Sequence, residues 1–391
     1  MKTTHTYTMI WLMIDGDIVI IGGGFAGLEA ARLLSKQRSK LSNRHVIVVD
    51  AKKTFDFLPV LPDVVGGRIQ KKNAVLDLAD HLESLRVNLE PDEFVRVDID
   101  SNEVFLKNGG VLCYEFLVIA CGSVTNFYGM DDVQRRSLKL DTAEDAIVLQ
   151  NVVTTYPNKK IIIVGGGYTG IEIATSLAFL LRRKRIKKYS INVIERAEDI
   201  LSSLPEWMRD YCRVNLSRLR VNAYTECSIE EVSDQRVKLS NGMIFEDYIL
   251  VWAAGVVTPP FVRDLKFEKD KQGRLSVNEH MMFSDRCFAV GDAAAFKHGN
   301  SVLRMAVQFS VAQARVAVAN ILKEVKGVKK SAKYRPVDLG FLVPMANRKA
   351  CGKVLIFRVS GSFGWFLHYV MCIYRSLSLD NKLGIFGDAF K

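Results

Sequence analysis

Two short glycine clusters are the residues whose types and spacing most directly predict chemistry in this chain. In the first, Gly22, Gly24 and Gly27 follow four aliphatic residues and precede the helix-forming sequence Leu-Glu-Ala-Ala. The first glycine permits a tight turn, the second lets a diphosphate approach the backbone, and the third lets helix and strand lie close together. Because a helix N-terminus favours an anion, this cluster predicts a site for the diphosphate of a dinucleotide.

The chain repeats this pattern. Gly165, Gly167 and Gly170 follow a second aliphatic strand and precede Ile-Glu-Ile-Ala. In each copy the next strand ends in an acid, which is Asp50 in the first copy and Glu195 in the second. A dinucleotide-binding fold places its ribose-binding acid there. A lone glycine cluster also occurs in empty turns, so the duplication with matching acids is the stronger evidence.

The elements around the clusters predict how these residues are positioned. Each copy continues into a hairpin-and-strand arm, which ends at Cys121-Gly122 in the first copy and at Ala254-Gly255 in the second. A later short buried strand ends in Gly291-Asp292, and apolar residues at helical spacing predict a long helix from about Ser301 to Val325. The pattern predicts an α/β protein with two Rossmann-like dinucleotide-binding domains.

Composition narrows the classes of protein to which this chain can belong. The chain has 391 residues, 49% hydrophobic and 25% charged, which is typical of a folded protein of two or three domains. A net charge of +11 favours an anionic partner, which could be a nucleotide, a nucleic acid or a membrane surface. Seven dispersed cysteines without metal-ligand spacing predict reduced thiols and no metal site. Residues 1–17 do not match a signal peptide, and no apolar window is long enough to span a membrane.

Taken together, these motifs resemble the type II NADH dehydrogenases, which are monotopic NADH:quinone oxidoreductases in the two-dinucleotide-domain flavoprotein disulfide reductase superfamily. The resemblance extends from Asp17 to the end of the chain. The segments that carry it are Phe57–Leu61 with Gly67 behind it, Gly165–Glu172, Trp252–Val256, Phe288–Ala293 and Gly361–Phe386. It implies an FAD-binding domain (1–135 and 256–350), an NADH-binding domain (136–255) and a C-terminal membrane-association or dimer segment (351–391).

The resemblance also implies which residues bind the two cofactors. Those implied to hold FAD are Gly22, Gly24, Gly27, Asp50, Cys121, Gly122, Gly291 and Asp292. Those implied to hold NADH are Gly165, Gly167, Gly170, Glu195, Ala254 and Gly255. A carboxylate at Glu195 repels the 2′-phosphate of NADPH, whereas the adjacent Arg196 can bind that phosphate. The sequence therefore leaves the preference between NADH and NADPH open.

The implied activity is hydride transfer from NADH to FAD, followed by transfer of two electrons to a membrane quinone. Glu172 and Gln308 are the implied catalytic residues. An acid in the first turn of a helix is also stabilised by the helix dipole, and Glu29 holds the equivalent position in the first copy. The quinone-binding motif of the family is only partly present in this chain. Its first glutamine is present as Gln308, but the glutamine expected one helical turn later is replaced by Ala312. Gln313 is the second candidate for the quinone side.

The C-terminal segment predicts the membrane partner. Its apolar residues recur at helical spacing among basic ones, at Phe363, Phe366, Leu367, Val370, Tyr374 and Leu377. With the resemblance and the positive charge, this pattern favours an interfacial amphipathic helix that binds the protein, through residues 361–391, to the anionic cytoplasmic face of the cell membrane. A core-docking or dimer helix is the alternative, and a homodimer is expected.

Two other functions remain open from the sequence. A sulfide:quinone oxidoreductase of the same fold would need two cysteines converging on the flavin, and Cys121 and Cys351 are the candidates. A non-catalytic flavin- and NAD-sensing protein could instead bind partners through its basic runs. Nucleic acid is not expected, because apart from Tyr189 the basic runs lack interleaved aromatic residues.

Overall fold

The structure is a computed structural model that describes residues 18–329 and 332–391. The expectation that residues 1–17 contain no signal peptide lies outside the described residues. The chain forms two compact units. Among the described residues, unit 1 comprises 18–55, 77–123, 257–329 and 332–338, and unit 2 comprises 56–76, 124–256 and 339–391.

Unit 1 is built on a six-stranded sheet with the order β21-β22-β9-β1-β2-β5. The central strands have the sequences IVII, VIVV and FLVI, and all their residues are buried. Apolar runs buried on both faces are typical of parallel strands, and β1 indeed pairs in parallel with β2 and β9. The strands are β1 (Ile18–Ile21), β2 (Val46–Val49), β5 (Asn88–Glu90), β9 (Phe116–Ile119), β21 (Met282–Ser284) and β22 (Cys287–Ala289).

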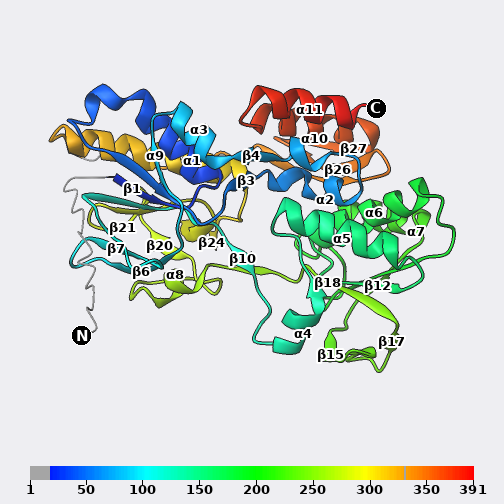
Figure 1. Ribbon diagram of the computed structural model, residues 1–391. Coiled ribbons are helices and arrows are strands. Elements are labelled where there is room, and N and C mark those ends of the chain that lie inside the picture. The colour runs from blue at the N-terminus through cyan, green and yellow to red at the C-terminus, as the bar shows by residue number, and fades with distance from the viewer. Residues whose placement is uncertain (1–17, 330–331) are drawn as a thin grey trace, which may run out of the picture. The chain divides into compact units, whose positions relative to one another are not determined.

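Two helices of unit 1, α1 (Phe25–Lys36) and α9 (Val307–Val325), lie side by side (Figure 1). Helix α9 begins later than the sequence predicts, because Ser301–Val302 forms strand β24 and pairs with β23. The other elements of unit 1 are α3 (Leu78–Ser84), β6 (Phe94–Asp98), β7 (Glu103–Leu106), β8 (Val111–Cys113), α8 (Pro260–Asp264), β20 (Leu275–Val277) and β23 (Ala294–His298).

Unit 2 repeats the parallel architecture in a five-stranded sheet with the order β11-β18-β12-β13-β14. All its strand pairs are parallel. Its strands are β11 (Ser137–Leu138), β12 (Lys160–Val164), β13 (Ser190–Ile194), β14 (Val221–Tyr224) and β18 (Tyr248–Trp252). Its longer helices are α5 (Ala143–Thr155), α6 (Tyr168–Arg183) and α7 (Glu206–Arg218). The two glycine clusters therefore belong to two equivalent sheets, as the duplication predicts.

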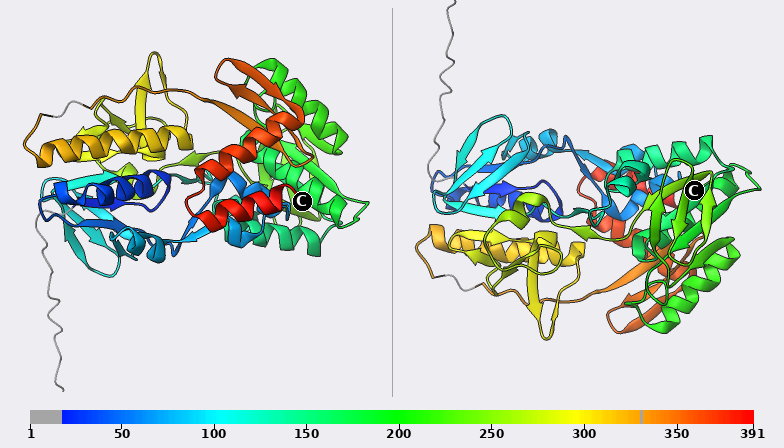
Figure 2. Two further views of the ribbon diagram at one scale, coloured as in Figure 1. Left: turned by 90° about the horizontal axis from the view of Figure 1, so that it is seen from above. Right: turned by 90° about the horizontal axis from the view of Figure 1, so that it is seen from below.

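The C-terminal part of unit 2 is a three-stranded antiparallel sheet followed by two helices, α10 and α11, that lie side by side (Figure 2, left). Helix α10 contacts all three strands of this sheet. The elements are β25 (Gly340–Met345), β26 (Lys349–Val354), β27 (Phe357–Ser360), α10 (Gly361–Arg375) and α11 (Leu379–Ala389). The tail that the sequence predicts as one helical stripe is thus a pair of helices.

The remaining elements are short. Unit 2 also contains α2 (Leu61–Val65), α4 (Asp131–Arg136), β15 (Ile229–Val232), β16 (Arg236–Leu239) and β17 (Ile244–Glu246). Four strands lie where the chain passes from one unit to the other: β3 (Thr54–Asp56), β4 (Val75–Asp77), β10 (Val124–Thr125) and β19 (Val256–Val257). Among the described residues, no helix combines the length and the apolar character needed to cross a bilayer.

The compact units divide the chain differently from the expected functional domains. Residues 56–76 fall in unit 2 with the second glycine cluster, whereas the sequence assigned them to the FAD-binding domain. Residues 339–391 also belong to unit 2, because β25 contacts α6 and β26 contacts α7. The segment 351–391 is therefore part of a compact body within unit 2 and not a separate appendage.

Candidate functional site

The first glycine cluster forms a tight turn in unit 1. Gly22 has a φ of +105°, a backbone conformation that side chains disfavour. A Cβ added at Gly27 would lie 1.8 Å from the carbonyl oxygen of Gly22, so only glycine fits there. The Oδ2 of Asp50 accepts a 2.7 Å hydrogen bond from the amide of Gly23, and its Oδ1 accepts a 2.8 Å bond from the amide of Lys52. The acid at the end of β2 is therefore fixed against the loop.

The second cluster reproduces this geometry in unit 2. Gly165 has a φ of +107°, and a Cβ at Gly170 would lie 1.8 Å from the carbonyl oxygen of Gly165. The Oε2 of Glu195 accepts a 2.7 Å bond from the amide of Gly166, and its Oε1 accepts a 2.8 Å bond from the amide of Ala197. Both acids thus make the same pair of backbone contacts.

The middle glycine of each cluster leaves room for a ligand. No atom lies within 4 Å of a Cβ added at Gly167, and the nearest atom to one added at Gly24 is 3.9 Å away. Each of these glycines is the N-cap of the following helix, and neither cap is closed by a side chain. Free helix N–H groups beside open space are what a diphosphate requires, so both clusters fit a dinucleotide.

The Gly291-Asp292 turn of unit 1 lies between two other polar groups. The Ser123 hydroxyl donates a 2.9 Å hydrogen bond to the Oδ2 of Asp292. Burial raises the pKa of Asp292 against the opposing effects of Ser123 and Arg274. The buried Gln313 accepts a 2.7 Å bond from the Gly291 amide through its Oε1. The quinone-side candidate Gln313 therefore contacts the turn that the resemblance assigns to FAD.

The end of the first arm lies in the same unit. Cys121 is half-buried, and its Sγ contacts the carbonyl oxygen of Gly122 at 3.8 Å. Burial raises the pKa of the Cys121 thiol, and the negative charges of Asp292 and Asp50 add to the shift. Since the thiolate is the reactive form of cysteine, Cys121 is held in its unreactive thiol form.

The end of the second arm is covered by Tyr128. Its hydroxyl donates a 2.9 Å hydrogen bond to the carbonyl oxygen of Ala254. A Cβ at Gly255, whose φ is +135°, would lie 2.6 Å from the same hydroxyl oxygen. The indole N–H of Trp252 donates a 2.7 Å bond to the carbonyl oxygen of Asn126. These contacts fix the carboxyl end of β18, beside which the parallel strand β12 runs into the second glycine cluster.

Glu172 lies just beyond the first turn of α6, not within it as the sequence predicts, and it shares a small cavity with a second acid, Asp63. Burial and the Asp63 charge raise the pKa of Glu172 to about 8. Glu29, its counterpart in α1, instead accepts 2.8 Å hydrogen bonds from Arg32 and Arg315. Burial acts to raise the pKa of Glu29, but these two arginines outweigh it and lower the pKa. The two equivalent positions thus hold carboxyl groups whose pKa values are shifted in opposite directions.

Gln308, the other implied catalytic residue, lies in the first turn of α9. It is partly exposed, and its Nε2 donates a 3.1 Å hydrogen bond to the Oδ1 of Asp338. Asp338 also forms an ion pair with Arg304. Gln308 and the buried Gln313 therefore contact different groups within unit 1, as expected for residues five positions apart on a helix.

The sequence did not single out Asp63, Arg68 or Tyr369. The Tyr369 hydroxyl donates a 2.6 Å hydrogen bond to the Oδ1 of Asp63, and the Nε of Arg68 lies 3.5 Å from the same oxygen. One signal could have identified the first of them. Asp63 is the single charged residue in the apolar run Phe57–Val65, and a buried acid normally needs a partner.

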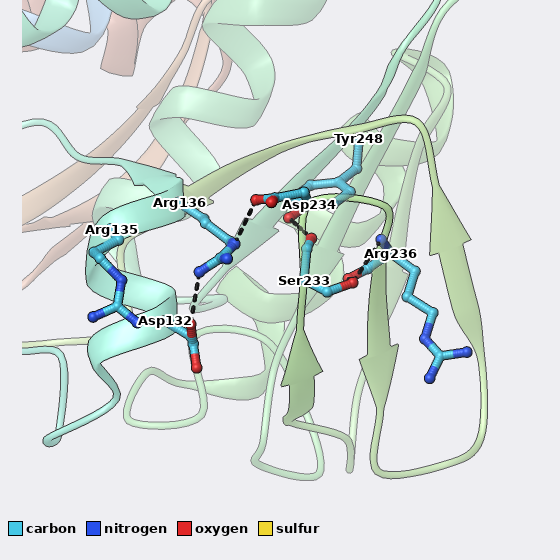
Figure 3. Close-up of polar contacts among 7 residues, drawn as sticks. All are labelled: Asp132, Arg135, Arg136, Ser233, Asp234, Arg236 and Tyr248. Carbon is cyan, nitrogen blue, oxygen red and sulfur yellow. Dashed lines mark hydrogen bonds and ion pairs between the residues drawn. The ribbon is translucent and has the colours of Figure 1, made fainter.

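The basic surface of unit 2 carries acids next to its arginines. Arg136 on α4 lies between Asp132, at 2.6 Å, and Asp234, at 2.8 Å (Figure 3). Arg135 forms an ion pair with the same Asp132. Arg236 forms an ion pair with Glu231. Each of these three arginines therefore has a carboxylate partner nearby.

The cysteines show one close pair. The Sγ atoms of Cys212 on α7 and Cys351 on β26 lie 3.6 Å apart, and both residues are buried in unit 2. The hydrogen bond to Cys351 and burial raise the pKa of Cys212. Cys351 therefore lies against Cys212, whereas Cys121 belongs to unit 1. Within residues 18–329 and 332–391, no group of three or more His, Cys, Asp or Glu side chains could hold a metal ion.

The two C-terminal helices bury one face and expose the other. Helix α10 buries Trp365, Tyr369 and Cys372, and α11 buries Ile385. The exposed large apolar residues of these helices are Phe363, Phe366, Val370, Met371, Tyr374, Leu379, Leu383 and Phe386. Three more, Leu355, Ile356 and Phe357, lie at and beside the turn between β26 and β27. We call these eleven residues the apolar face.

Comparison with known proteins supports the assignment of both nucleotide folds. Among curated proteins the chain is 26% identical over 387 residues to demethylphylloquinone reductase NdbB of Synechocystis sp., with 94% of each chain covered. It is 24% identical over 388 residues to type II NADH:quinone oxidoreductase of Haemophilus influenzae, with 86% of this chain and 87% of that protein covered.

Solved structures show the same fold. The structure of NDH2 from Plasmodium falciparum in complex with NADH matches with a TM-score of 0.85 at 16% identity, covering 97% of this chain and 98% of that one. Sulfide:quinone oxidoreductase from Aquifex aeolicus matches with a TM-score of 0.77 at 18% identity, covering 92% of this chain and 90% of that one. The model of the pyridine nucleotide-disulphide oxidoreductase family matches residues 16–320, which include both glycine clusters. The chain therefore belongs to the pyridine nucleotide-disulphide oxidoreductase family.

Proposed function

We propose that this protein is a monotopic NADH:quinone oxidoreductase that uses FAD and does not pump protons. The observation that carries the proposal is the pair of complete glycine clusters, each with its acid hydrogen-bonded to the loop. Relatives named as quinone reductases match almost the whole chain. FAD, when bound, supplies a ring that accepts a hydride and releases its two electrons to a quinone.

The proposed FAD site is the glycine cluster of unit 1. Gly22, Gly24 and Gly27 leave the N-terminus of α1 open to a diphosphate, and Asp50 binds the adenosine ribose. Gly291 and Asp292, with Cys121 and Gly122, line the flavin side. The Ser123 hydroxyl and the Gln313 amide position the Gly291-Asp292 turn through the two hydrogen bonds described above.

The proposed NADH site is the equivalent cluster of unit 2. Gly165, Gly167 and Gly170 bind the diphosphate, and Ala254 and Gly255 line the nicotinamide side. Glu195 binds the ribose hydroxyls, because its two backbone contacts aim a carboxylate beside the loop. Arg196 is exposed, so it is available to a 2′-phosphate. We therefore propose NADH as the preferred donor, with NADPH accepted more weakly.

Glu172 and Gln308 are the proposed catalytic residues. Quinone reduction consumes two protons, and a carboxyl group that keeps its proton at neutral pH can supply one. Glu172 meets that requirement, whereas its counterpart Glu29 is ion-paired with two arginines. Gln308 presents an amide at the start of α9 for a quinone carbonyl, and Gln313 lies deeper on the same helix.

The proposed membrane contact is the apolar face of unit 2, on the cytoplasmic side of the cell membrane. The distribution of charge supports lipid as its partner, since Lys353 and Arg358 form a cross-strand pair directly behind the exposed turn residues. Basic residues behind an apolar edge suit anionic headgroups. Pairing of two copies through residues 351–391 is the accompanying proposal for the oligomer.

A steady-state assay tests the proposed activity. The purified protein, loaded with FAD, is given NADH, NADPH or sulfide as donor and a short-chain ubiquinone or naphthoquinone as acceptor. We expect turnover with NADH and a quinone, weaker turnover with NADPH, and none with sulfide. Sulfide oxidation would favour the sulfide:quinone alternative, and failure with every donor would favour a non-catalytic sensor.

A further inference from the structure

The cavity beside Glu172 brings together residues from four segments of unit 2. It is lined by α2, α6, β25 and α10, and its volume of about 10 Å³ is room for roughly one water molecule. Two carboxyl groups line it, those of Asp63 and Glu172. The Tyr369 ring and the hydroxyl-bearing Ser176 are also part of its wall. Two acids that share so small a space do not both ionise readily, because each charge opposes the other.

The two acids have unequal partners. Asp63 accepts the 2.6 Å hydrogen bond from Tyr369, and the Arg68 guanidinium lies 3.5 Å from the same oxygen. Arg68 is itself held in place, since it donates to the Ala346 carbonyl oxygen and lies over the Phe179 ring. No described residue donates a hydrogen bond to the carboxyl group of Glu172. The site therefore stabilises a negative charge on Asp63 and not on Glu172.

We propose that Asp63, held by Tyr369 and Arg68, is a positioning residue that keeps Glu172 in its protonated acid form at neutral pH. The inference rests on the proposed function for its purpose, because a protonated Glu172 is the proton donor for quinone reduction. Asp63 and Tyr369 act through Glu172 and need not touch a substrate. Tyr369 lies on α10, so the first of the two C-terminal helices contributes to the chemistry of the site as well as to the apolar face.

The other titratable groups around the cavity leave this charge balance intact. His368 and Cys372 also lie on α10, with the Nε2 of His368 3.5 Å from the Sγ of Cys372. Burial lowers the pKa of His368 to about 4 and raises the pKa of Cys372, so both are neutral at pH 7. Arg68 is then the cation whose charge acts on Asp63. A single cation balances one carboxylate, which leaves the second acid protonated.

The pKa directions agree with this geometry. Burial raises the pKa of Asp63 to about 6, while the Tyr369 hydrogen bond and the Arg68 charge act to lower it. Burial and then the Asp63 charge raise the pKa of Glu172 to about 8. On raising the pH, Asp63 therefore loses its proton first, and its charge then holds the proton on Glu172.

Infrared spectroscopy of the FAD-loaded protein tests the proposal without turnover. The carbonyl stretch of a protonated carboxyl group is followed against pH, and the Glu172 band is the one that Glu172→Gln removes. We expect a midpoint near pH 8 in the native protein. In Asp63→Asn the midpoint falls by about 1 pH unit or more, because the charge that opposes ionisation is gone.

A second variant tests the hydrogen bond and keeps the aromatic packing. In Tyr369→Phe, Asp63 loses a donor and its pKa rises, so the proton remaining on the pair is shared with Asp63. A carbonyl band of protonated Asp63 then appears at neutral pH, and adding Asp63→Asn to Tyr369→Phe removes it. FAD content and the temperature of unfolding establish that each variant is folded.

Matched controls separate this effect from a general response to substitution. Asp199 is another buried, arginine-paired aspartate of unit 2, and Tyr248 is another hydrogen-bonded tyrosine of unit 2. Asp199→Asn and Tyr248→Phe should leave the Glu172 midpoint unchanged. A midpoint in Asp63→Asn equal to that of the native protein, or a Glu172 ionised at pH 7 in the native protein, overturns the proposal. Because the titration needs no turnover, lack of NADH:quinone activity would overturn the proposed function alone.

Discussion

Glu29 and Glu172 each lie two residues after the last glycine of a duplicated loop, yet one is ion-paired and the other is not. Glu29 accepts hydrogen bonds of 2.8 Å from Arg32 and Arg315, which favour its carboxylate. Glu172 faces the acid Asp63 across a small cavity, which favours its protonated form. The duplicated fold accepts an acid at this position in both units, and the neighbours alone decide what that acid does.

The first prediction concerns the chemistry of Glu172. Glu172→Gln should slow quinone reduction by tenfold or more, about 1.4 kcal/mol in barrier, and should slow flavin reduction by NADH much less. The reason is that the amide cannot donate a proton, although it retains the shape of the acid. Stopped-flow measurement of the two half-reactions checks this. Equal slowing of both would exclude a role in proton delivery, and Glu29→Gln serves as the positional control.

The second prediction distinguishes two glycines of the proposed NADH site. Gly170→Ala should destabilise unit 2 severely, because the new Cβ would lie 1.8 Å from the carbonyl oxygen of Gly165. Gly167→Ala should leave the fold intact, since its Cβ meets no atom within 4 Å, but should weaken NADH binding by crowding the diphosphate.

Thermal unfolding and NADH titration measure the two effects separately. Gly387→Ala is the matched control, because Gly387 lies in α11 with open space around it. If Gly167→Ala binds NADH as tightly as the native protein does, the diphosphate does not sit at this loop.

The third prediction concerns the choice between NADH and NADPH. Arg196→Glu should raise the ratio of kcat/KM for NADH over NADPH by about tenfold, which corresponds to about 1.4 kcal/mol. Glu195→Gln should lower that ratio, because the repulsion of the 2′-phosphate is lost while the hydrogen-bond acceptor for the loop amide is retained. Parallel assays with both donors check the ratio. No change in either variant would mean that the ribose lies elsewhere.

The fourth prediction concerns the apolar face. The double variant Ile356→Asp and Phe357→Asp should weaken partitioning into anionic vesicles by at least tenfold, because burying one large apolar side chain contributes roughly 1.5 to 3 kcal/mol. Co-sedimentation with vesicles measures the loss, and reduction of a water-soluble quinone should be unaffected.

Ile244→Asp provides the control for this prediction, since Ile244 is 48% exposed on strand β17, outside the apolar face. Neutral vesicles and a sedimentation velocity run complete the experiment. A dimer that dissociates in the double variant, with vesicle binding unchanged, would assign the turn between β26 and β27 to the contact between two copies.

The fifth prediction is the pH dependence of stability. The pKa of Glu172 is about 8 in the folded protein against an ordinary value of 4.5, so between these values the folded state binds more protons than the unfolded state. The free energy of unfolding should therefore fall as the pH rises from about 5 to 8. Glu172→Gln should flatten this dependence, and urea unfolding at several pH values measures it. If the free energy of unfolding of the variant falls with pH as steeply as that of the native protein, Glu172 is not protonated in the folded state.

Local patterns predicted the geometry of the two glycine loops. The spacing of Gly22, Gly24 and Gly27 indicated a tight turn and a close helix–strand contact, and the φ of Gly22 and the space at Gly27 agree with it. Asp50 and Glu195 were predicted from their place at the end of a strand. All these features follow from the geometry of a few consecutive residues, which is why one sequence was sufficient.

The carboxyl pair could not be predicted in the same way. Asp63 and Tyr369 are separated by 306 positions, and their hydrogen bond exists because α2 and α10 meet in unit 2. The helical stripe of α10 indicated one apolar face, and nothing in its spacing showed that the opposite face carries His368, Tyr369 and Cys372 towards an acid. Such long-range contacts depend on tertiary packing and not on a local period.

The sheet of unit 1 has a consequence for how the protein is made. Strand β22 pairs with β9, and its Cys287 lies opposite Leu117, about 170 residues earlier in the chain. At a synthesis rate of roughly 5 to 20 residues per second, the outer edge of β9 stays unpaired for about ten seconds or more on the ribosome. An aliphatic strand with an open edge can pair with other chains. A chaperone that binds extended apolar segments should therefore associate with nascent chains that end before Cys287 and release those that extend beyond it.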